Sequence, residues 1–324
     1  MKAAVVKGPG QKPQYTNFSE PVAKDGEEVI SVHASALSQL TKSRASGSHY
    51  SSDGHFPAVA GTDGVGRTTG GERVYFVLPE TPFGALAEKS LVKAQHCIPL
   101  PQDLDDITAA AIGNPGMSAW AAMMERARLK AGETVLVNGA TGTAGRLAIQ
   151  LAKYLGAAKV IATGRNDDEL REVKALGADV TIPFTLGTLH PMGTKRYEEA
   201  LIEEFPNGID VVVDYLWGES ARTIIAAVAK SVEDARPVRF VHVGGASGED
   251  SIDLPGAGLR SSAIVLMGSG VKSVRSSALL GAIKSVFEAA IPARLQIATK
   301  TVPLSEVEEC WSAPGKPRVV FTLD

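Results

Sequence analysis

The chain has few cysteines, little net charge and no long apolar run. Only two cysteines, Cys97 and Cys310, occur in 324 residues, which excludes a disulfide framework and is typical of a reducing compartment such as the cytoplasm. The formal net charge of −3 argues against nucleic acid or an anionic membrane as a general partner. No apolar stretch is long enough to span a bilayer, and Met1–Lys7 does not resemble a signal peptide.

Several common catalytic motifs are also missing. The chain has no G-x-S-x-G nucleophile elbow, and neither cysteine lies in a recognisable nucleophile motif. The six histidines form no H-E-x-x-H pattern, so we interpret them as ordinary polar or core residues. One cluster, His49, Asp53 and His55, could hold a metal only by accident. The sequence therefore gives no positive sign of nucleophilic or metallopeptidase chemistry.

The most informative segment is a glycine-punctuated turn between an apolar run and an amphipathic helix. Residues 134–137 are β-rich and apolar, as in a strand that is buried on both faces. Gly139, Gly142 and Gly145 punctuate the turn that follows. In such a unit the glycines allow a tight turn, a close approach of backbone N–H groups to a pyrophosphate, and close packing of helix on strand. The context predicts a dinucleotide site; a tight strand–helix turn without a ligand is the alternative.

The tip of the next strand indicates which dinucleotide binds. Residues 159–163 form the expected second strand, and Gly164 and Arg165 follow it. A site for NAD places Asp or Glu at this tip to hold the ribose 2′-hydroxyl. Glycine leaves room instead, and a guanidinium can grip a 2′-phosphate with two hydrogen bonds, so we predict NADPH. Asn166 is a candidate to assist; the alternative is that Arg165 is a solvated loop charge beside two aspartates.

The rest of the chain divides into parts that are rich in β-like runs and a part in which β-like and helical stretches alternate. Residues 1–113 hold short β-like runs between turn clusters, which is typical of an antiparallel, barrel-like domain. From 114 to 272, β-like and helical stretches alternate, which implies a parallel sheet with crossover helices. Residues 273–324 contain a helical stretch and then return to β-like runs, which we expect to rejoin the first domain. The predicted strands are 3–6, 28–32, 64–67, 73–77, 85–92, 135–137, 159–162, 180–182, 209–213, 239–243, 263–267, 297–302 and 318–323, and the last two flank a helix at 304–311.

Five segments stand in a specific order along nearly the whole chain: AGTDGVGR at 60–67, GERVY at 71–75, FGALAE at 83–88, AAAIGNPGMSAW at 109–120 and GETVLVNGATGTAG at 132–145. In this order the five segments resemble those of the medium-chain dehydrogenase/reductase superfamily. Within that superfamily they resemble the zinc-free quinone oxidoreductase-like branch. The resemblance implies an α/β fold with a Rossmann parallel-sheet cofactor domain and a GroES-like antiparallel β-barrel catalytic domain. It also implies NADPH-dependent hydride transfer to a quinone or an α,β-unsaturated carbonyl compound.

The resemblance also implies roles for individual residues. Zinc-dependent members hold the metal at positions that fall here on Ser38, Thr62 and Asn114, and none of these suits zinc, so we expect no metal. Neutral donors must then stabilise the oxyanion. Tyr75 and Asn114 are the catalytic candidates, although Tyr75 could merely pack, and the candidate substrate contacts are Ser38, Tyr50, Thr62 and Tyr75. The expected cofactor-binding residues are Ser118, Gly139, Ala140, Thr141, Gly142, Thr143, Ala144, Gly145, Gly164, Arg165, Asn166, Tyr215, Gly244, Gly245, Gly268 and Ser269.

Two other interpretations of function stay open. The missing zinc ligands also fit a protein that binds NADPH and senses its redox state without turnover, because a fold does not fix a function. The other is a carbonyl reductase of the alcohol dehydrogenase type. We further expect a homodimer, because the apolar strand Ile264–Met267 would invite pairing if it lies at a sheet edge, and relatives commonly join their sheets there. The alternative is an interior strand of a monomer.

Overall fold

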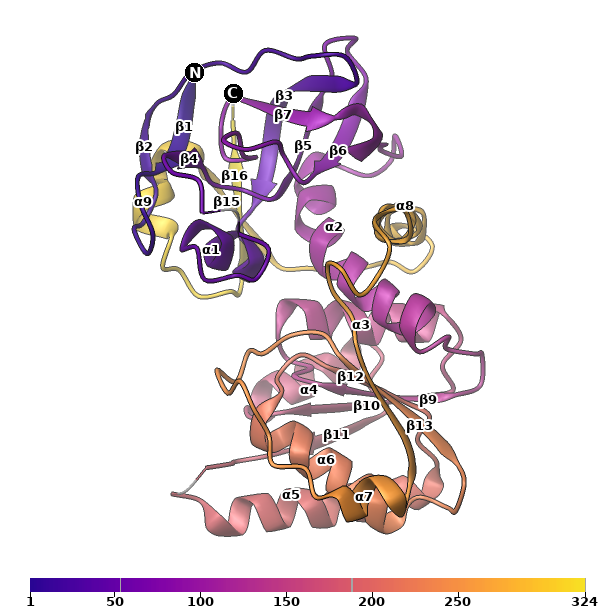
Figure 1. Ribbon diagram of the computed structural model, residues 1–324. Coiled ribbons are helices and arrows are strands. Elements are labelled where there is room, and N and C mark those ends of the chain that lie inside the picture. The colour runs from indigo at the N-terminus through magenta and orange to yellow at the C-terminus, as the bar shows by residue number, and fades with distance from the viewer. Residues whose placement is uncertain (53, 188, 324) are drawn as a thin grey trace. The chain divides into compact units, whose positions relative to one another are not determined.

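The structure, a computed structural model (Figure 1), describes residues 1–52, 54–187 and 189–323. They form two compact units. The chain passes from the first unit to the second between Asn114 and Pro115, inside helix α2 (Asp106–Trp120), and returns inside helix α8 (Ser276–Ala290). The predicted boundary after residue 113 lies next to the observed one, whereas that after residue 272 falls before α8. The first unit is Met1–Asn114, Ile283–Ile291 and the segment from Ile297 onward; the second is Pro115–Ala282 and Pro292–Gln296.

The second unit is built on a parallel sheet with the strand order β11-β10-β9-β12-β13-β14 (Figure 1). Counted along the chain this is 3-2-1-4-5-6, the order of a Rossmann fold, and it reverses between β9 and β12. Ligands of such sheets bind beyond the carboxyl ends of the strands at this reversal. The strands are β9 (Thr134–Asn138), β10 (Lys159–Gly164), β11 (Val180–Pro183), β12 (Val211–Asp214), β13 (Pro237–His242) and β14 (Ala263–Gly268). The connecting helices are α3 (Thr143–Tyr154), α4 (Asp167–Ala175), α5 (Pro191–Glu204), α6 (Gly218–Ser231) and α7 (Gly256–Arg260).

The strands of this sheet are apolar because side chains on both faces are buried. Leu136 and Ile161 lie in one cluster with Leu201 of α5 and Ile224 of α6. Val137, whose side chain points to the opposite face of the sheet, is equally buried. This double burial explains why the runs do not alternate between apolar and polar residues.

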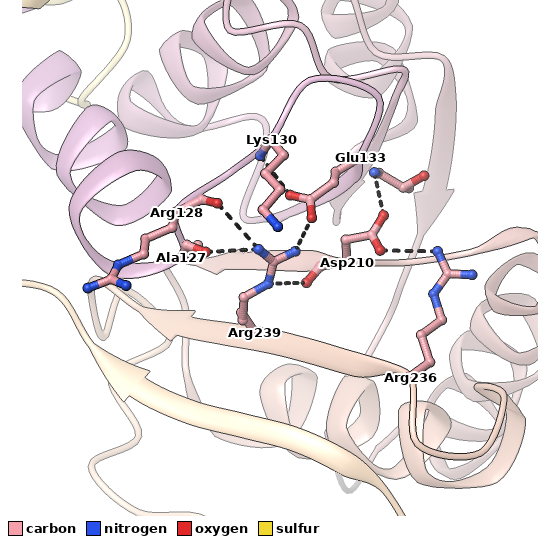
Figure 2. A network of polar contacts seen from close by, with 8 residues as sticks. Ala127, Arg128, Lys130, Glu133, Asp210, Arg236 and Arg239 are labelled. Carbon is pink, nitrogen blue, oxygen red and sulfur yellow. Dashed lines mark hydrogen bonds and ion pairs between the residues drawn. The ribbon is translucent and has the colours of Figure 1, made fainter.

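Charged side chains tie together the amino ends of three neighbouring strands of the sheet (Figure 2). Arg239 on β13 lies 2.7 Å from the Glu133 carboxylate, just before β9, and its Nε donates to the backbone oxygen of Asp210, just before β12. The Asp210 carboxylate pairs with Arg236 and accepts from the Thr134 backbone N–H. These groups therefore hold the register of the sheet at the end opposite to the glycine turn.

Strand β14 is an edge strand in the part of the chain that the structure describes. It pairs in parallel with β13 and lies at one end of the strand order. Val265 and Leu266 on this strand are 46% and 37% exposed. The alternative that Ile264–Met267 is an interior strand is therefore wrong.

The first unit contains two mainly antiparallel sheets. The smaller has the order β2-β1-β4, and the larger follows the path β15-β16-β3-β5-β6-β8, with β7 also paired to β3. Because β16 pairs with β3, the C-terminal segment rejoins the first domain as predicted. The strands are β1 (Lys2–Val6), β2 (Gln14–Asn17), β3 (Glu27–Ala36), β4 (Ala58–Val59), β5 (Asp63–Arg67), β6 (Arg73–Val77), β7 (Lys89–Lys93), β8 (Cys97–Pro99), β15 (Thr299–Pro303) and β16 (Arg318–Thr322).

Some predicted elements differ in extent from the observed ones. The strand predicted at 85–92 begins only at Lys89, because the backbone N–H groups of Ala85 and Leu86 bond to Gly61 and Ala60. The sequence pattern misses the short elements α1 (Gln39–Ala45), β2, β4 and β8. The predicted helix at 304–311 is a 3-10 turn (Leu304–Glu306) and a short α9 (Val307–Cys310); other 3-10 turns are Ala94–His96 and Phe205–Asn207, and a π-helix at Ala121–Arg126 extends α2. In the described ranges, no helix has the length and apolarity needed to cross a bilayer.

Candidate functional site

The glycine turn connects β9 to α3 at the carboxyl edge of the parallel sheet. Gly139 has a φ of +83°, in the left-handed region that favours glycine. A Cβ on Gly145 would lie 2.4 Å from the Gly139 oxygen, so only glycine lets α3 approach the turn this closely. Gly142 is the N-cap of α3, and no side chain there bonds to the first-turn N–H groups. The turn therefore has the geometry that an approaching anion requires at a helix N-terminus.

A buried polar network, which the sequence analysis misses, lies directly beneath this turn. The Asn138 amide, at the end of β9, donates to the Asp214 carboxylate at the end of β12 over 2.8 Å. Thr163 on β10 donates to Asn138, and His242 at the end of β13 lies 2.9 Å from Asp214. Asp214 also accepts from the backbone N–H of Trp217. The network thus joins the carboxyl ends of four adjacent strands and fixes the loop that follows β12.

The strand tip predicted to choose the cofactor follows β10. A Cβ on Gly164 would lie 2.9 Å from Cγ2 of Thr141, so packing against the glycine turn also requires glycine here. Arg165 is exposed and makes no ion pair with any residue that the structure describes. The Asn166 side chain caps α4 by accepting from two backbone N–H groups, those of Asp168 and Glu169. Asn166 therefore uses its side-chain oxygen in the cap, and Arg165 stays the predicted contact for a 2′-phosphate.

The other predicted cofactor residues of the second unit lie at the same edge of the sheet. Tyr215 follows β12 and is buried; burial raises the pKa of its phenol, and the neighbouring Ser118 hydroxyl opposes the shift. Gly244 and Gly245 follow β13, Gly268 ends β14, and the Ser269 N–H donates to the backbone oxygen of His242. Thr141, Thr143, Ala140 and Ala144 belong to the glycine turn itself. The predicted cofactor set is thus brought together along one edge, where Rossmann ligands bind.

In the first unit the predicted substrate residues Ser38 and Thr62 meet in a group of buried hydroxyls. Ser38 is the N-cap of α1, where it accepts from the Thr41 N–H and donates to the Thr41 hydroxyl over 3.0 Å. The Thr41 and Thr62 oxygens lie 3.2 Å apart. By the resemblance described above, Ser38 and Thr62 are expected to fall at two of the three positions where zinc-dependent members hold the metal. Neutral hydroxyls are poor partners for zinc, so the chemistry of this group suits hydrogen bonding instead.

Tyr75 does not face open space, which favours the packing alternative over a contact with substrate. Its side chain is fully buried, and its ring packs edge-on against Phe287 with centroids 5.0 Å apart. A Cβ on Gly113 would lie 2.3 Å from this ring. The Tyr75 hydroxyl donates to Asp63 over 2.7 Å, and burial raises its pKa well above the ordinary value. The Tyr75 hydroxyl is thus used inside the core, as the packing alternative expects.

A buried carboxylate, Asp63, stands at the centre of this unit and is also missed from the sequence. It is 1% exposed and accepts from Thr62 over 2.6 Å as well as from Tyr75. Burial raises the pKa of Asp63, while the two hydroxyl donors and the Arg318 guanidinium oppose this. Arg318 is 6% exposed, and its Nε and Nη2 lack a hydrogen-bond partner in the described part of the molecule. In the sequence, the sign of this buried acid is Asp63 in the segment AGTDGVGR, directly after Thr62, which the resemblance places at a zinc-ligand position.

A cavity of about 70 Å³ lies beside the hydroxyl group within the first unit. Thr41 and Thr62 line it, together with Arg44, His55 and Phe83. This volume is far below that of a pocket for a drug-sized ligand, so it admits only the head of an acceptor. Asn114, at the end of the first unit, is half-buried, and its backbone lowers the pKa of Tyr75.

Tyr50 and His49, near α1, do not line this cavity. Tyr50 is 61% exposed and its ring lies 4.2 Å from that of His49. Burial and the Arg44 charge lower the pKa of His49, which favours the neutral imidazole. Asp53, the acid of the cluster with His49 and His55, lies outside the described residues. Within the described ranges no group of three or more His, Cys, Asp or Glu side chains could hold a metal.

The chain is similar to several known oxidoreductases. A family model described as zinc-binding dehydrogenase matches residues 144–287, a range that excludes Ser38, Thr62 and Asn114. A probable NADPH-dependent quinone reductase of Emericella nidulans is 28% identical over 92% of both chains. An NADPH-dependent alkenal/one oxidoreductase of Arabidopsis thaliana is 31% identical over 61% of this chain and 52% of its own. The solved quinone oxidoreductase of Thermus thermophilus, also solved in complex with NADPH, is 25% identical, with a TM-score of 0.80 over the whole of both chains.

The fold and the glycine turn define a two-unit α/β reductase with a Rossmann unit and an antiparallel-sheet unit. The matching family model, the relatives and the solved structures support the medium-chain dehydrogenase/reductase superfamily, in its quinone oxidoreductase-like branch, as the family that this chain resembles.

Proposed function

We propose that the protein is an NADPH-dependent oxidoreductase that reduces a quinone or an α,β-unsaturated carbonyl compound without zinc. The observation that carries the proposal is the linked hydroxyl group Ser38–Thr41–Thr62, because it occupies two former zinc-ligand positions and lines a small cavity. The names of the relatives support the choice of reaction: a quinone reductase, an alkenal/one oxidoreductase and a quinone oxidoreductase.

The second unit is proposed to hold the cofactor. Gly139, Gly142 and Gly145 leave the backbone at the start of α3 open to a pyrophosphate, and Arg165 is placed to take the 2′-phosphate. NADPH, when bound, supplies the hydride from its dihydronicotinamide ring. The protein's part is to orient the acceptor and to stabilise the charge that develops on its oxygen.

The hydroxyl group is suited to conjugated acceptors rather than to simple ketones. Reduction of an unactivated carbonyl puts a full alkoxide charge on one oxygen, which a metal ion stabilises well. A quinone or enone spreads the charge over a hydroquinone anion or an enolate, for which neutral donors suffice. The hydroxyls of Thr41 and Thr62 are among the donors that line the cavity. Asn114 stays a candidate for a further donor.

The experiment is NADPH oxidation by the purified protein with quinones, enones, enals, simple ketones and simple alcohols in parallel, with and without a chelator. We expect turnover with at least one conjugated acceptor, weak turnover with simple ketones and no effect of chelation. Faster reaction of simple ketones or alcohols than of any conjugated acceptor would refute the proposal. NADPH binding without turnover on any acceptor would favour the sensor interpretation.

We also propose that two chains associate through β14. Among the described residues, β14 pairs with a strand on one side alone, that of β13, and it exposes Val265 and Leu266. A second copy could cover both features across a two-fold axis. Cys97 and Cys310 are free thiols, which supports the proposal of a reducing, cytoplasmic environment.

A further inference from the structure

We infer that Asp63 supplies the proton that completes the reduction, and that the Thr62 and Thr41 hydroxyls pass it to the acceptor in the cavity. The inference rests on the proposed function, because an enone that accepts a hydride on its β-carbon must also gain a proton. The hydroxyls alone can pass a proton on but cannot supply one, because each hydroxyl must be reprotonated after it donates. A carboxylic acid at the inner end of the hydroxyl group provides that store.

The geometry forms a continuous path. The Asp63 Oδ1 lies 2.6 Å from the Thr62 oxygen, which lies 3.2 Å from the Thr41 oxygen. Every hydroxyl on the path can donate and accept at the same time. Thr41 and Thr62 line the cavity, whereas Asp63 does not. In the described part of the molecule, the Thr62 and Thr41 hydroxyls therefore give Asp63 a path for exchanging a proton with an acceptor in the cavity.

The surroundings of Asp63 suit both of its protonation states. In the described residues, the titratable and charged groups that face it are Tyr75 on β6 and Arg318 on β16. Burial favours the neutral acid, while the Tyr75 hydroxyl and the Arg318 charge stabilise the carboxylate that remains after donation. Among the described residues, Nε and Nη2 of Arg318 have no hydrogen-bond partner, so these two nitrogens are not engaged by another acceptor there. A purely structural carboxylate would need no path to a cavity.

The hydride adds two electrons and one hydrogen to the β-carbon, which leaves an enolate and oxidised cofactor. The Thr41 O–H bond breaks and its proton bonds to the enolate oxygen; Thr41 takes the Thr62 proton, and Thr62 takes the Asp63 proton. The resulting enol becomes the saturated carbonyl compound. Asp63 is left as a carboxylate and regains a proton from solvent through the same hydroxyls once the product has gone.

The first test compares hydroxyl removal with a conservative change. Thr62→Val removes the relay hydroxyl with little change of shape, and we expect kcat for an enone to fall about 100-fold, the usual contribution of a general acid. Thr62→Ser keeps a hydroxyl and should retain most of kcat and the solvent deuterium isotope effect of the unmutated protein. Thr41→Val and Thr41→Ser repeat the comparison if Thr62→Val does not fold. NADPH affinity should be unchanged in all four.

Ser35→Ala is the matched control, because the Ser35 hydroxyl donates to the backbone oxygen of Asp63 and is buried beside it, but lies off the path. We expect its kcat to stay near that of the unmutated protein even if it is less stable. If Thr62→Val and Thr41→Val lose no more kcat than Ser35→Ala, the relay is overturned and the hydroxyls only pack.

A second measurement does not depend on turnover. The infrared spectrum of the unmutated protein should contain a protonated carboxylic acid band at neutral pH that disappears in Asp63→Asn. Absence of this band would overturn the relay whatever the activity. A protein that shows the band but reduces no acceptor would instead contradict the proposed function while supporting Asp63 as a proton store.

Discussion

Replacing Arg165 by alanine should remove most of the preference for NADPH over NADH. Arg165 is exposed at the tip of β10 and makes no ion pair with any residue that the structure describes, so the change removes no such pair within the protein. A hydrogen bond to a charged group contributes about 1.5–3 kcal/mol. Because about 1.4 kcal/mol is a tenfold change, Arg165→Ala should weaken NADPH binding roughly tenfold to a hundredfold. NADH, which has no 2′-phosphate, should bind as before.

The assay is a fluorescence titration of the unmutated and variant proteins with each cofactor at two salt concentrations. Because the site is exposed, the effect should shrink at high salt. Arg171→Ala is the matched control, since Arg171 is also exposed on α4 but pairs with Asp168. It should leave the ratio of the two affinities unchanged. Equal affinity of the unmutated protein for both cofactors, or an equal loss for both in Arg165→Ala, would refute the assigned role.

Three further predictions concern stability, metal content and assembly. Tyr75→Phe removes a buried donor to Asp63 and should lower the free energy of unfolding by about 1–3 kcal/mol, measured by chemical denaturation; an unchanged value would show that the hydrogen bond contributes nothing. Protein purified without added metal should contain far less than one zinc per chain and keep its activity with a chelator; stoichiometric zinc and loss of activity on chelation would contradict this. Leu266→Asp on the exposed edge strand should convert a dimer into monomers in sedimentation, whereas an unmutated protein that is already monomeric at micromolar concentration would contradict the proposed dimer.

The glycine turn could be predicted from sequence because its requirements are local. Gly139 needs a left-handed backbone and Gly145 needs close packing onto the same turn, so both are determined by neighbours within a few residues. The alternation of strands and helices likewise predicts the Rossmann unit, since each βαβ segment is contiguous. The edge position of β14 follows from the strand order of that fold.

The buried polar groups could not be predicted in this way, because their contacts join distant segments. Tyr75 looks like any tyrosine on a β-like run until β5 brings Asp63 against its hydroxyl and α8 brings Phe287 against its ring. Arg318 lies in the C-terminal strand, and its position beside Asp63 depends on the pairing of β16 with β3. The link from Asn138 to Asp214 depends on strand order rather than on sequence neighbours.

The contact between Gly164 and Thr141 has a consequence for how cofactor use in this protein can evolve. A change to NADH would ordinarily begin with an acidic residue at the tip of β10, yet any Cβ there would lie 2.9 Å from Cγ2 of a stiff, β-branched threonine. The acidic residue is therefore disfavoured until position 141 becomes smaller. That earlier change would alter the glycine turn on which either cofactor depends. The choice of cofactor therefore depends on residues 141 and 164, and residue 141 must become smaller first. A single substitution at residue 164 should weaken cofactor binding before it changes the preference for NADPH.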